Sequence, residues 1–356
     1  MAYYRAAPLP APPTPARVGV LLVNLGTPDK ASYFAVQRYL SEFLGDRRVI
    51  DTPRPIWLPL LYGFVLPFRP LRTARNYRKI WMPEGSPLAV YSRRLASKID
   101  GLLKETHGPE VSVELAMTYG RPSIAAAIEK FARQHVRKLL VLPLYPHYCS
   151  STTGSVFDRV TRELQRWRWV PEVRFVHDYH DDAGYIEALC EGIEKHWKEV
   201  GQRSHLMFSY HGIPAIYVAN GDPYQRQAET TTRLVAKRLG LSEGEWSHCY
   251  QSRFGNVVWL QPYTINTLEE LAKRGVRRIS VVSPSFAADC LETLEEVAIE
   301  YRDAFVEKGG AELRLVPSLN DGERHARALS DIVANAIKGW KLVEAEQPSR
   351  ELAPDA

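Results

Sequence analysis

Short runs of apolar residues alternate with amphipathic segments along most of this chain. The first run, 18–25, is nearly all apolar, which is typical of a strand buried on both faces of a sheet. The later apolar runs cover 111–117, 138–145, 172–177, 205–210, 256–260, 278–283 and 312–316. The segments with helical spacing between them include 31–44, 123–134, 185–199, 227–239 and 265–274. Strands that alternate with helices predict an α/β protein with parallel sheets.

Eight candidate strands are too many for one small doubly wound domain but suit two domains of about four strands each. We therefore predict an α/β fold with two Rossmann-like domains, each a roughly four-stranded parallel sheet flanked by helices. The divide is placed near 175, because the segment 167–171, Trp-Arg-Trp-Val-Pro, breaks the alternation. The predicted domains are 17–175 and 176–340, and the last helix (323–339) is expected to be able to pack back on the first domain.

Both ends of the chain lack the alternating pattern. Residues 1–16 form a Pro-rich stretch without the apolar core of a signal peptide, and residues 341–356 are charged and contain proline. Both are predicted to be disordered tails.

The segment 56–68 departs from the alternation because it is strongly apolar yet contains two prolines. It then becomes basic, with Arg69 and four further cations up to residue 79. It is too short and too interrupted by proline to span a bilayer. One interpretation is a core segment beside solvated arginines. The other is an apolar ridge that suits a large flat ligand with carboxylates, or a membrane surface. We refer to residues 56–75 as the lip.

Composition narrows the class of protein. The chain has 356 residues, 45% of them apolar, which is ordinary for a globular protein. The formal charge of +5 comes without a long basic block, so nucleic acid is not an expected partner. The cysteines are scattered and form no Cys-x-x-Cys pair, which argues against a zinc site and a disulfide framework and favours a reducing compartment. They are Cys149, Cys190, Cys249 and Cys290.

His211 stands where a reactive imidazole would be useful. It follows the apolar run 206–208 and comes just before Gly212 and Pro214, which end the strand. In an open parallel sheet, ligands bind beyond the carboxyl ends of the strands. A single histidine is more often a hydrogen-bonded structural residue, so both interpretations stay open on this observation alone.

The stretch 283–303 carries a row of acidic residues after the strand that ends at Ser283. A helix is expected to begin near Ala287 or Ala288, and its carboxylates recur at intervals of three or four positions, which stacks them on one face. These acids are Asp289, Glu292, Glu296, Glu300 and Asp303. A solvated acidic face is one interpretation. A carboxylate track that conducts protons or cations is the other, and such acids, if buried together, have raised and coupled pKa values.

His211 and Glu292 both follow the ends of candidate strands in the second domain, so they can face one cleft although 292 − 211 = 81 positions separate them. An imidazole and a carboxylate together can accept protons or hold a divalent metal transiently. Two ligands are too few for a closed structural site, which implies an exchangeable one.

Taken together, these features resemble those of the ferrochelatase family, enzymes that insert Fe²⁺ into a porphyrin to make haem. The resemblance runs from about residue 18 to about residue 324 and rests on several motifs taken together. They are Val-Asn-Leu-Gly-Thr-Pro (23–28), Tyr-Pro-His-Tyr-Cys-Ser-Ser-Thr-Thr-Gly-Ser (145–155), Ser-Tyr-His-Gly-Ile-Pro (209–214), Gly-Asp-Pro-Tyr (221–224), Tyr-Gln-Ser-Arg-Phe-Gly (250–255) and Asp-Cys-Leu-Glu-Thr-Leu-Glu-Glu (289–296).

The resemblance implies a role for particular residues. His211 and Glu292 match the catalytic pair and iron contacts of the family. Glu296 and Glu300 match further members of its acidic row, and together with Asp289 we interpret them as a proton or metal relay. The residues that match porphyrin-binding positions are Leu25, Arg69, Tyr119 and Trp259, with Arg69 facing a propionate.

Two departures from the family pattern concern cysteine. Some members carry an iron–sulfur cluster on C-terminal cysteines, but no cysteine follows Cys290 here, so no cofactor is expected. Cys290 itself stands where relatives often have histidine. The expected substrates are ferrous iron and a porphyrin, with protoporphyrin IX favoured over coproporphyrin. We expect a cytoplasmic monomer that can touch the membrane peripherally through the lip.

Three other functions are compatible with parts of this sequence. A chelatase for another metal or tetrapyrrole, such as cobalt into a corrin precursor, would share the fold and a His/Glu site. A non-catalytic haem carrier would need a pocket but no carboxylate row. Nucleotide binding is suggested only by the Rossmann-like alternation, and neither a Gly-x-Gly-x-x-Gly nor a Walker lysine follows a strand.

Overall fold

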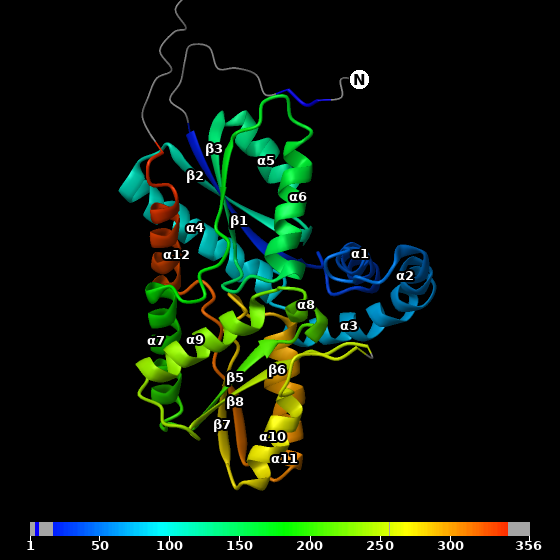
Figure 1. Ribbon diagram of the computed structural model, residues 1–356, viewed down its shortest axis with the longest axis vertical. Helices are drawn as coiled ribbons and strands as arrows, with labels where there is room; N and C mark the ends of the chain where they lie inside the picture. The colour runs from blue at the N-terminus through cyan, green and yellow to red at the C-terminus, as the bar shows by residue number, and fades with distance from the viewer. Residues whose placement is uncertain (1–3, 7–16, 256, 341–356) are drawn as a thin grey trace, which may run out of the picture.

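The computed structural model describes residues 4–6, 17–255 and 257–340. It contains two parallel sheets that lie one after the other along the long axis of the molecule (Figure 1). The strand order is β2-β1-β3-β4 in the first sheet and β6-β5-β7-β8 in the second. The strands are β1 Arg17–Thr27, β2 Val111–Gly120, β3 Val136–Pro143, β4 Glu172–Phe175, β5 His205–His211, β6 Trp246–Gln251, β7 Arg278–Val282 and β8 Glu312–Leu315. This confirms the predicted α/β fold of two four-stranded parallel sheets.

Helices flank both sheets. The α-helices are α1 Tyr33–Leu44, α2 Arg54–Leu60, α3 Leu66–Ile80, α4 Pro87–His107, α5 Ile124–Arg133, α6 Ser155–Leu164, α7 Ala183–Glu199, α8 Ala215–Ala219, α9 Tyr224–Arg238, α10 Thr264–Lys273, α11 Arg302–Glu307 and α12 Glu323–Ala336. Within the described residues the π-helical segments are η1 Leu61–Val65, η2 Ser150–Gly154 and η3 Glu292–Tyr301. π-Helical turns are rare and often mark functional sites. These three fall in the lip, the 145–155 motif and the acidic row.

Strand β1 lies in the middle of the first sheet and is buried along almost its whole length, as its apolar sequence predicts. Its carboxyl end turns at Gly26, whose φ of +106° belongs to the region that glycine favours. A Cβ at this position would stand 1.8 Å from the carbonyl oxygen of Tyr119. The glycine therefore lets β1 and β2 stay paired up to the edge where they end.

The predicted strand at 256–260 is wrong, because Val257 and Val258 lie in a surface loop with 58% and 67% of their area exposed. The fourth strand of the second sheet is instead β6, which carries polar residues. The buried Gln251 and the partly buried His248 both have hydrogen-bond partners: the Ser209 hydroxyl donates to Gln251 Oε1 at 2.6 Å, and Thr232 Oγ1 lies 2.9 Å from His248 Nδ1. Satisfied polar groups therefore replace the apolar signal in this strand.

The predicted start of the acidic helix near Ala287 or Ala288 is also wrong. Residues 283–290 form a loop, and the π-helix η3 begins at Glu292. Asp289 lies in this loop, where it accepts hydrogen bonds from Thr293 Oγ1 (3.0 Å), Asn320 Nδ2 (2.8 Å) and the backbone N–H of Ser318 (3.2 Å). Its carboxylate ends the loop and is not part of the acidic helix face.

One hydrophobic cluster continues from the first sheet into the second. It joins residues of β1, β3 and α4 to residues of β5, α7, α9 and α12. The last helix, α12, packs against both α4 and α7 (Figure 1). Arg174 at the end of the first sheet donates to the carbonyl oxygens of Ala336 (2.8 Å) and Lys338 (2.9 Å). The C-terminal part of the described chain thus returns to the first sheet.

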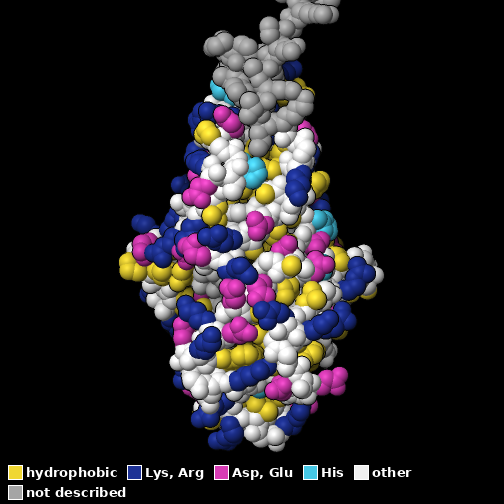
Figure 2. Space-filling view, turned by 90° about the vertical axis from the view of Figure 1, so that its left-hand side faces the viewer, with side chains coloured by type: hydrophobic (Ala, Val, Ile, Leu, Met, Phe, Trp, Pro, Cys, Tyr) yellow, Lys and Arg dark blue, Asp and Glu magenta, His cyan; other side chains and the backbone are white. Residues whose placement is uncertain are grey.

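On the face shown in Figure 2, Lys and Arg side chains are interleaved with Asp and Glu side chains and form no single basic patch. Among the described residues, no helix has the length and apolar content needed to cross a bilayer. Of the predicted tails, residues 4–6 lie against the turn at 166–168, where the N–H of Arg5 donates to the Arg166 carbonyl oxygen. The remaining tail residues lie outside the described part of the chain.

Candidate active site

The lip forms the helices α2, η1 and α3, which project from the body beside α1 (Figure 1). One face of it packs inward through Trp57, Leu61 and Leu66, and the Trp57 indole N–H donates to the Leu44 carbonyl oxygen at 2.7 Å. The other face is apolar and exposed. Its large exposed side chains are Ile56, Leu58, Leu60, Tyr62, Phe64, Phe68 and Leu71. The interpretation of the lip as a simple core segment is therefore wrong, since only one of its two apolar faces is buried.

Arg69 points from α3 toward the second domain. Its guanidinium carbon lies 4.7 Å from the centre of the Phe254 ring, in a loop that we call the rim loop (252–255 and 257–259). Its Nη1 is buried without a hydrogen-bond partner in the described structure. Burial lowers the pKa of Arg69, and the nearby Glu292 carboxylate opposes this by favouring the charged form. Arg69 thus brings a cation with a free donor to the edge of the acidic helix.

His211 is the last residue of β5, as the sequence predicts for a strand that stops at Gly212. Its Nδ1 lies 2.6 Å from the Gly212 carbonyl oxygen, which can only accept. The neutral ring therefore carries its proton on Nδ1 and presents the Nε2 lone pair. The imidazole stands between two aromatic rings, with centroid distances of 6.4 Å to Trp259 and 6.2 Å to Phe286.

Glu296 is the acidic residue with the most hydrogen-bond donors around it. The backbone N–H of Ser252 donates to Oε1 at 2.9 Å, and the Ser252 hydroxyl donates to Oε2. Tyr301 donates to Oε1 at 2.7 Å, and Gln251 Nε2 donates to Oε2 at 3.5 Å. Burial nevertheless raises the pKa of Glu296, and the Glu292 charge adds to the rise while the Ser252 and Tyr301 hydrogen bonds and His211 oppose it. A carboxylate that is buried yet well solvated by donors can exchange protons.

The other acids of η3 face the lip. Glu295 is buried and pairs with Lys79 at 2.7 Å, and Glu300 is exposed and pairs with Arg72 at 3.3 Å. Both cations belong to α3, so two ion pairs connect the acidic helix to the lip. The interpretation of the acidic row as a solvated face is therefore wrong for the partly buried Glu296, whereas Glu300 and Asp303 are exposed.

The structure brings His211 and Glu292 to the same edge of the second sheet. Gln251 is the strand partner of His211 in the ladder between β5 and β6. Its side chain donates from Nε2 to the carbonyl oxygen of Glu292 at 3.0 Å. Both His211 and Glu292 act electrostatically on Glu296. The three predicted residues thus surround the carboxyl end of β5.

A cavity of about 10 Å³, with room for about one water molecule, lies between the carboxyl end of β1 and the start of η3. Its polar lining includes Glu292 and Cys290, and its apolar lining includes the predicted Leu25. The lining further comprises Gly26, Thr27, Tyr39, Tyr77, Ile80, Ser86, Pro87, Leu88 and Leu291. His211 is not part of this lining. Thr27, Tyr39 and Tyr77 were missed from the sequence, where isolated polar residues after a strand or in a helix carry no distinctive spacing.

The structure does not place Tyr119 in the lining of that cavity. The side chain is 0% exposed, its hydroxyl donates to Asp46 Oδ2 at 3.0 Å, and the Arg159 guanidinium lies 4.5 Å from the ring centre. Trp259, in contrast, is half-buried beside His211, and its indole N–H donates to the Phe254 carbonyl oxygen at 2.9 Å. Trp259 therefore has the better position for a cleft wall, and Tyr119 supports the wall from behind.

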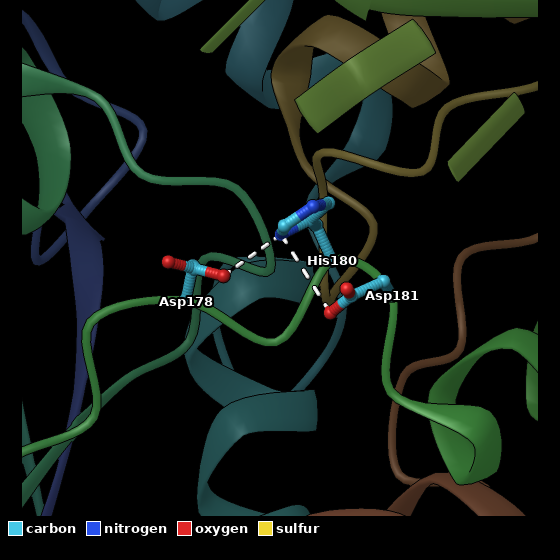
Figure 3. A group of neighbouring side chains, drawn as sticks. All are labelled: Asp178, His180 and Asp181. Carbon is cyan, nitrogen blue, oxygen red and sulfur yellow. Dashed lines mark hydrogen bonds and ion pairs between the residues drawn. The ribbon is translucent and has the colours of Figure 1, made fainter. Parts of the chain in front are cut away.

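Three other side chains gather their potential metal ligands in the connection after β4. One ligand atom each of Asp178, His180 and Asp181 lies within 4.8 Å of the others (Figure 3). The Asp178 carboxylate already accepts hydrogen bonds from Nδ1 of His180 (2.8 Å) and Nδ1 of His177 (2.9 Å). These bonds, with that to His180 first, lower the pKa of Asp178 to about 2. The observed contacts therefore hold the connection between β4 and α7.

The sequence model of the ferrochelatase family matches residues 17–337. A ferrochelatase from Nitrosococcus oceani is 48% identical over 327 residues, which cover 92% of this chain and 89% of the relative. A ferrochelatase from Bordetella pertussis is 49% identical over 332 residues, which cover 93% of this chain and 91% of the relative. These matches extend over both sheets and over every segment that contributes to the cleft.

Solved structures with the same fold include SirB from Bacillus subtilis with Fe3+ (TM-score 0.52, 12% identity, 90% of this chain and 95% of that one). Another is CbiX, described as the terminal enzyme for siroheme biosynthesis in denitrifying bacteria (TM-score 0.50, 13% identity, 89% and 99%). At such low identity these likenesses show the fold alone. The sequence matches decide the identity: the chain belongs to the ferrochelatase family, whose members insert ferrous iron into a porphyrin to form haem.

Proposed function

We propose that iron insertion takes place at the carboxyl end of β5, with His211 as the acceptor of pyrrole protons and Glu292 and Glu296 as its carboxylate partners. Insertion of Fe²⁺ requires the loss of two N–H protons from the macrocycle, so the site must accept two protons. The observation that carries this proposal is the convergence of His211, Glu292 and Glu296 at one strand end.

The tautomer of His211 suits a proton acceptor. Because Nδ1 donates to the Gly212 carbonyl oxygen, Nε2 has the lone pair that can take a proton from a pyrrole nitrogen. Protonation makes the ring cationic, and the Glu296 carboxylate stabilises that charge. The proton can then pass to Glu296, whose raised pKa brings it closer to that of an imidazole. Glu300, exposed beside Arg72, connects this row to solvent.

The apolar and aromatic side chains around the cleft can hold the faces of the macrocycle. Leu25, Leu291 and Trp259 offer such surfaces, and Phe254 lies under the Arg69 guanidinium. The free Nη1 of Arg69 is a suitable donor for a propionate. A ring gripped in a bent conformation exposes its nitrogens, and the remote contacts supply the free energy for that distortion.

The cavity in the described structure is too small for a tetrapyrrole, since ligand pockets of that kind measure roughly 300 Å³ or more. Entry therefore requires α3 and η3, which both contribute residues to the cavity lining, to move apart. The main connections across this gap are the Arg69–Phe254 contact and the ion pairs of Lys79 and Arg72 with η3. All three lie at the side chains' flexible ends, which lets the gap open without unfolding either sheet.

We favour protoporphyrin IX, with two propionates, over coproporphyrin, with four. Leu25, Leu88 and Leu291 give the cavity an apolar wall, and Arg69 offers one buried Nη1 without a hydrogen-bond partner in the described structure. We also expect no iron–sulfur cluster, because the four cysteines are buried, free and far apart in sequence.

Anaerobic steady-state kinetics with both porphyrins test the assignment. We expect Fe²⁺ to be inserted and protoporphyrin to have the higher kcat/KM. A preference for Co²⁺ and a corrin precursor would contradict the iron assignment. Porphyrin binding without metal insertion would identify a carrier. The variant His211→Ala distinguishes porphyrin binding from metal insertion, because it should bind the porphyrin without inserting iron.

The exposed apolar face of the lip suits a peripheral contact with a membrane. Phe64 and Phe68 expose 66% and 68% of their area, and the exposed Arg72 and Arg75 stand on the same part of α3 as Phe68. Apolar side chains can enter the boundary between head groups and acyl chains, while arginines attract anionic lipids. We propose that the monomeric enzyme meets its apolar porphyrin there. Flotation with anionic vesicles tests this contact, and analytical ultracentrifugation tests the monomer.

A further inference from the structure

Gln251 connects the two halves of the proposed active site. Its backbone pairs with β5 at His211, and its carbonyl oxygen accepts a hydrogen bond from the N–H of Gly212 at 2.8 Å. Its side chain, only 2% exposed, reaches the opposite way to the carbonyl oxygen of Glu292 (3.0 Å) and the carboxylate of Glu296 (3.5 Å). A single residue thus contacts both the end of β5 and the first turn of η3.

The orientation of this amide is fixed by a buried chain of hydroxyls. The Ser209 hydroxyl donates to Gln251 Oε1 at 2.6 Å and itself lies 2.9 Å from the Thr264 hydroxyl. Because Oε1 is engaged as an acceptor, the Nε2 donors must face η3. The Gln251 side chain is therefore held between a hydroxyl below and the π-helix above.

Ser252 adds a second connection to the same turn. Its backbone N–H and its hydroxyl both donate to Glu296, one to each oxygen of the carboxylate. Its φ is +65°, an uncommon conformation for a residue other than glycine. Such strain persists where the surroundings hold it and is often found at functional sites. Here it lets the N–H and the side chain of one residue point at one carboxylate.

We propose that Gln251 and Ser252 form a clamp that positions Glu292 and Glu296 relative to His211, so that the carboxylates stand within proton-transfer reach of the imidazole. The inference rests on the proposed function of these three residues. The clamp acts on the helix turn and not on the macrocycle, so Gln251 and Ser252 are positioning residues. Loss of either should lower the rate of metallation while porphyrin binding is preserved.

Two variants remove the clamp without a large change in shape. Gln251→Leu removes both Nε2 contacts, and Ser252→Gly removes the hydroxyl while it keeps the N–H and tolerates the positive φ. Changes in groups that orient functional residues typically cost about 10–100-fold in activity. We expect kcat to fall by about that factor in each variant, with the KM for porphyrin changed less than about twofold.

A matched control comes from the same strand. Ser247→Ala removes a β6 hydroxyl that lies 3.1 Å from His205 Nε2, away from η3, and should leave both constants unchanged. Thermal unfolding of all variants reports whether each is folded, and porphyrin fluorescence quenching gives the Kd directly. Ser252→Gly is the safer variant, because it deletes one hydroxyl in a loop.

The outcomes separate this inference from the function beneath it. If His211→Ala still turns over, the proposed proton acceptor is wrong and the clamp has nothing to position. If His211→Ala is inactive while folded Ser252→Gly and Gln251→Leu keep the wild-type kcat, the clamp is wrong. A rise in KM equal to the fall in kcat/KM would also overturn it, since that result assigns both residues to substrate binding.

Discussion

The carboxyl ends of β1 and β5 occupy equivalent places in two sheets of similar topology, yet they present opposite chemistry. β1 ends in Leu25 and Thr27, beside phenols and aliphatic groups of α1, α3 and α4. β5 ends in His211, beside the buried carboxylate of Glu296 and its four hydrogen-bond donors. The sheets supply the same kind of edge, and the segment that follows each strand decides whether this edge binds an apolar surface or handles protons.

The largest test of this contrast replaces the imidazole. His211→Ala should lower kcat by about 10²–10⁴-fold, the usual contribution of a positioned acid or base, because no group then accepts the pyrrole proton. The Kd for porphyrin should stay within about threefold, since β1 and the lip provide most of the apolar contact. Stopped-flow metallation and fluorescence quenching measure the two quantities. If kcat and the affinity for porphyrin fell equally, the end of β5 would contribute to binding as well as to proton transfer, and the contrast between the two strand ends would be wrong.

Arg69 tests the binding side. Arg69→Leu removes the cation with a free donor and should raise the KM for porphyrin about 10–100-fold, because a hydrogen bond to a charged group contributes roughly 1.5–3 kcal/mol. The value of kcat at saturation should change little. Arg78→Leu is a control, because Arg78 is exposed on the same helix and, within the described residues, its Nε donates only to the Ala74 carbonyl oxygen of that helix. A fall in kcat with unchanged KM would show that Arg69 acts on the acidic helix instead.

Two histidines extend the comparison to stability. His147 is buried and His248 is partly buried, and burial lowers their pKa to about 3 and about 4. The unfolded chain therefore binds more protons than the folded one below pH about 6.5, so the free energy of unfolding falls as the pH drops from 6.5 toward 4. Each histidine contributes about 1.4 kcal/mol per pH unit in that window.

Denaturant unfolding at several pH values measures this slope. His248→Asn should make it shallower, because one group that must stay neutral is lost. An equal slope in the wild type and in His248→Asn would show that other groups determine how the free energy of unfolding falls at acid pH.

The smallest expected effect concerns the outer face of the lip. Replacing both Phe64 and Phe68 with Ser should weaken binding to anionic vesicles about tenfold, since burial of a Phe side chain contributes roughly 1.5–3 kcal/mol when complete. Activity with a detergent-dispersed porphyrin should stay near that of the wild type. Vesicle flotation measures the binding, and replacement of the exposed Val306 in the second domain with Ser is the control. If the variant bound vesicles as well as the wild type does, the lip would not mediate membrane binding.

Much of this architecture is predictable from the chain because apolar runs of strand length identify buried strands wherever the core is apolar. The prediction fails at β6, where the partly buried His248 and the buried Gln251 are held by hydrogen bonds that no pattern of hydrophobicity contains. It fails again at Val257 and Val258, where apolar residues stand exposed on the rim loop. Both errors lie next to the cleft, where binding and chemistry favour buried polar groups and exposed apolar ones.

The site was predicted in its chemistry more than in its geometry. Spacing by four positions places Glu292, Glu296 and Glu300 together in an α-helix and in a π-helix alike, so sequence could not distinguish the two. The spacing also grouped Asp289 with them. Its carboxylate lies instead in the loop before η3, where it accepts hydrogen bonds from Asn320 and Thr293. Gln251 and Ser252 stood within a recognised motif, but nothing in the chain shows that they contact η3.

The continuous apolar cluster beneath the two sheets has a consequence for how this molecule can be divided. Residues of β1, α4, β5 and α12 share that cluster, and α12 lies on α4 across the boundary between the halves. A cut near residue 175 would expose apolar surfaces of both fragments to water. The two lobes are therefore partners in one cooperative melting unit and poor candidates for modular shuffling or split-reporter engineering.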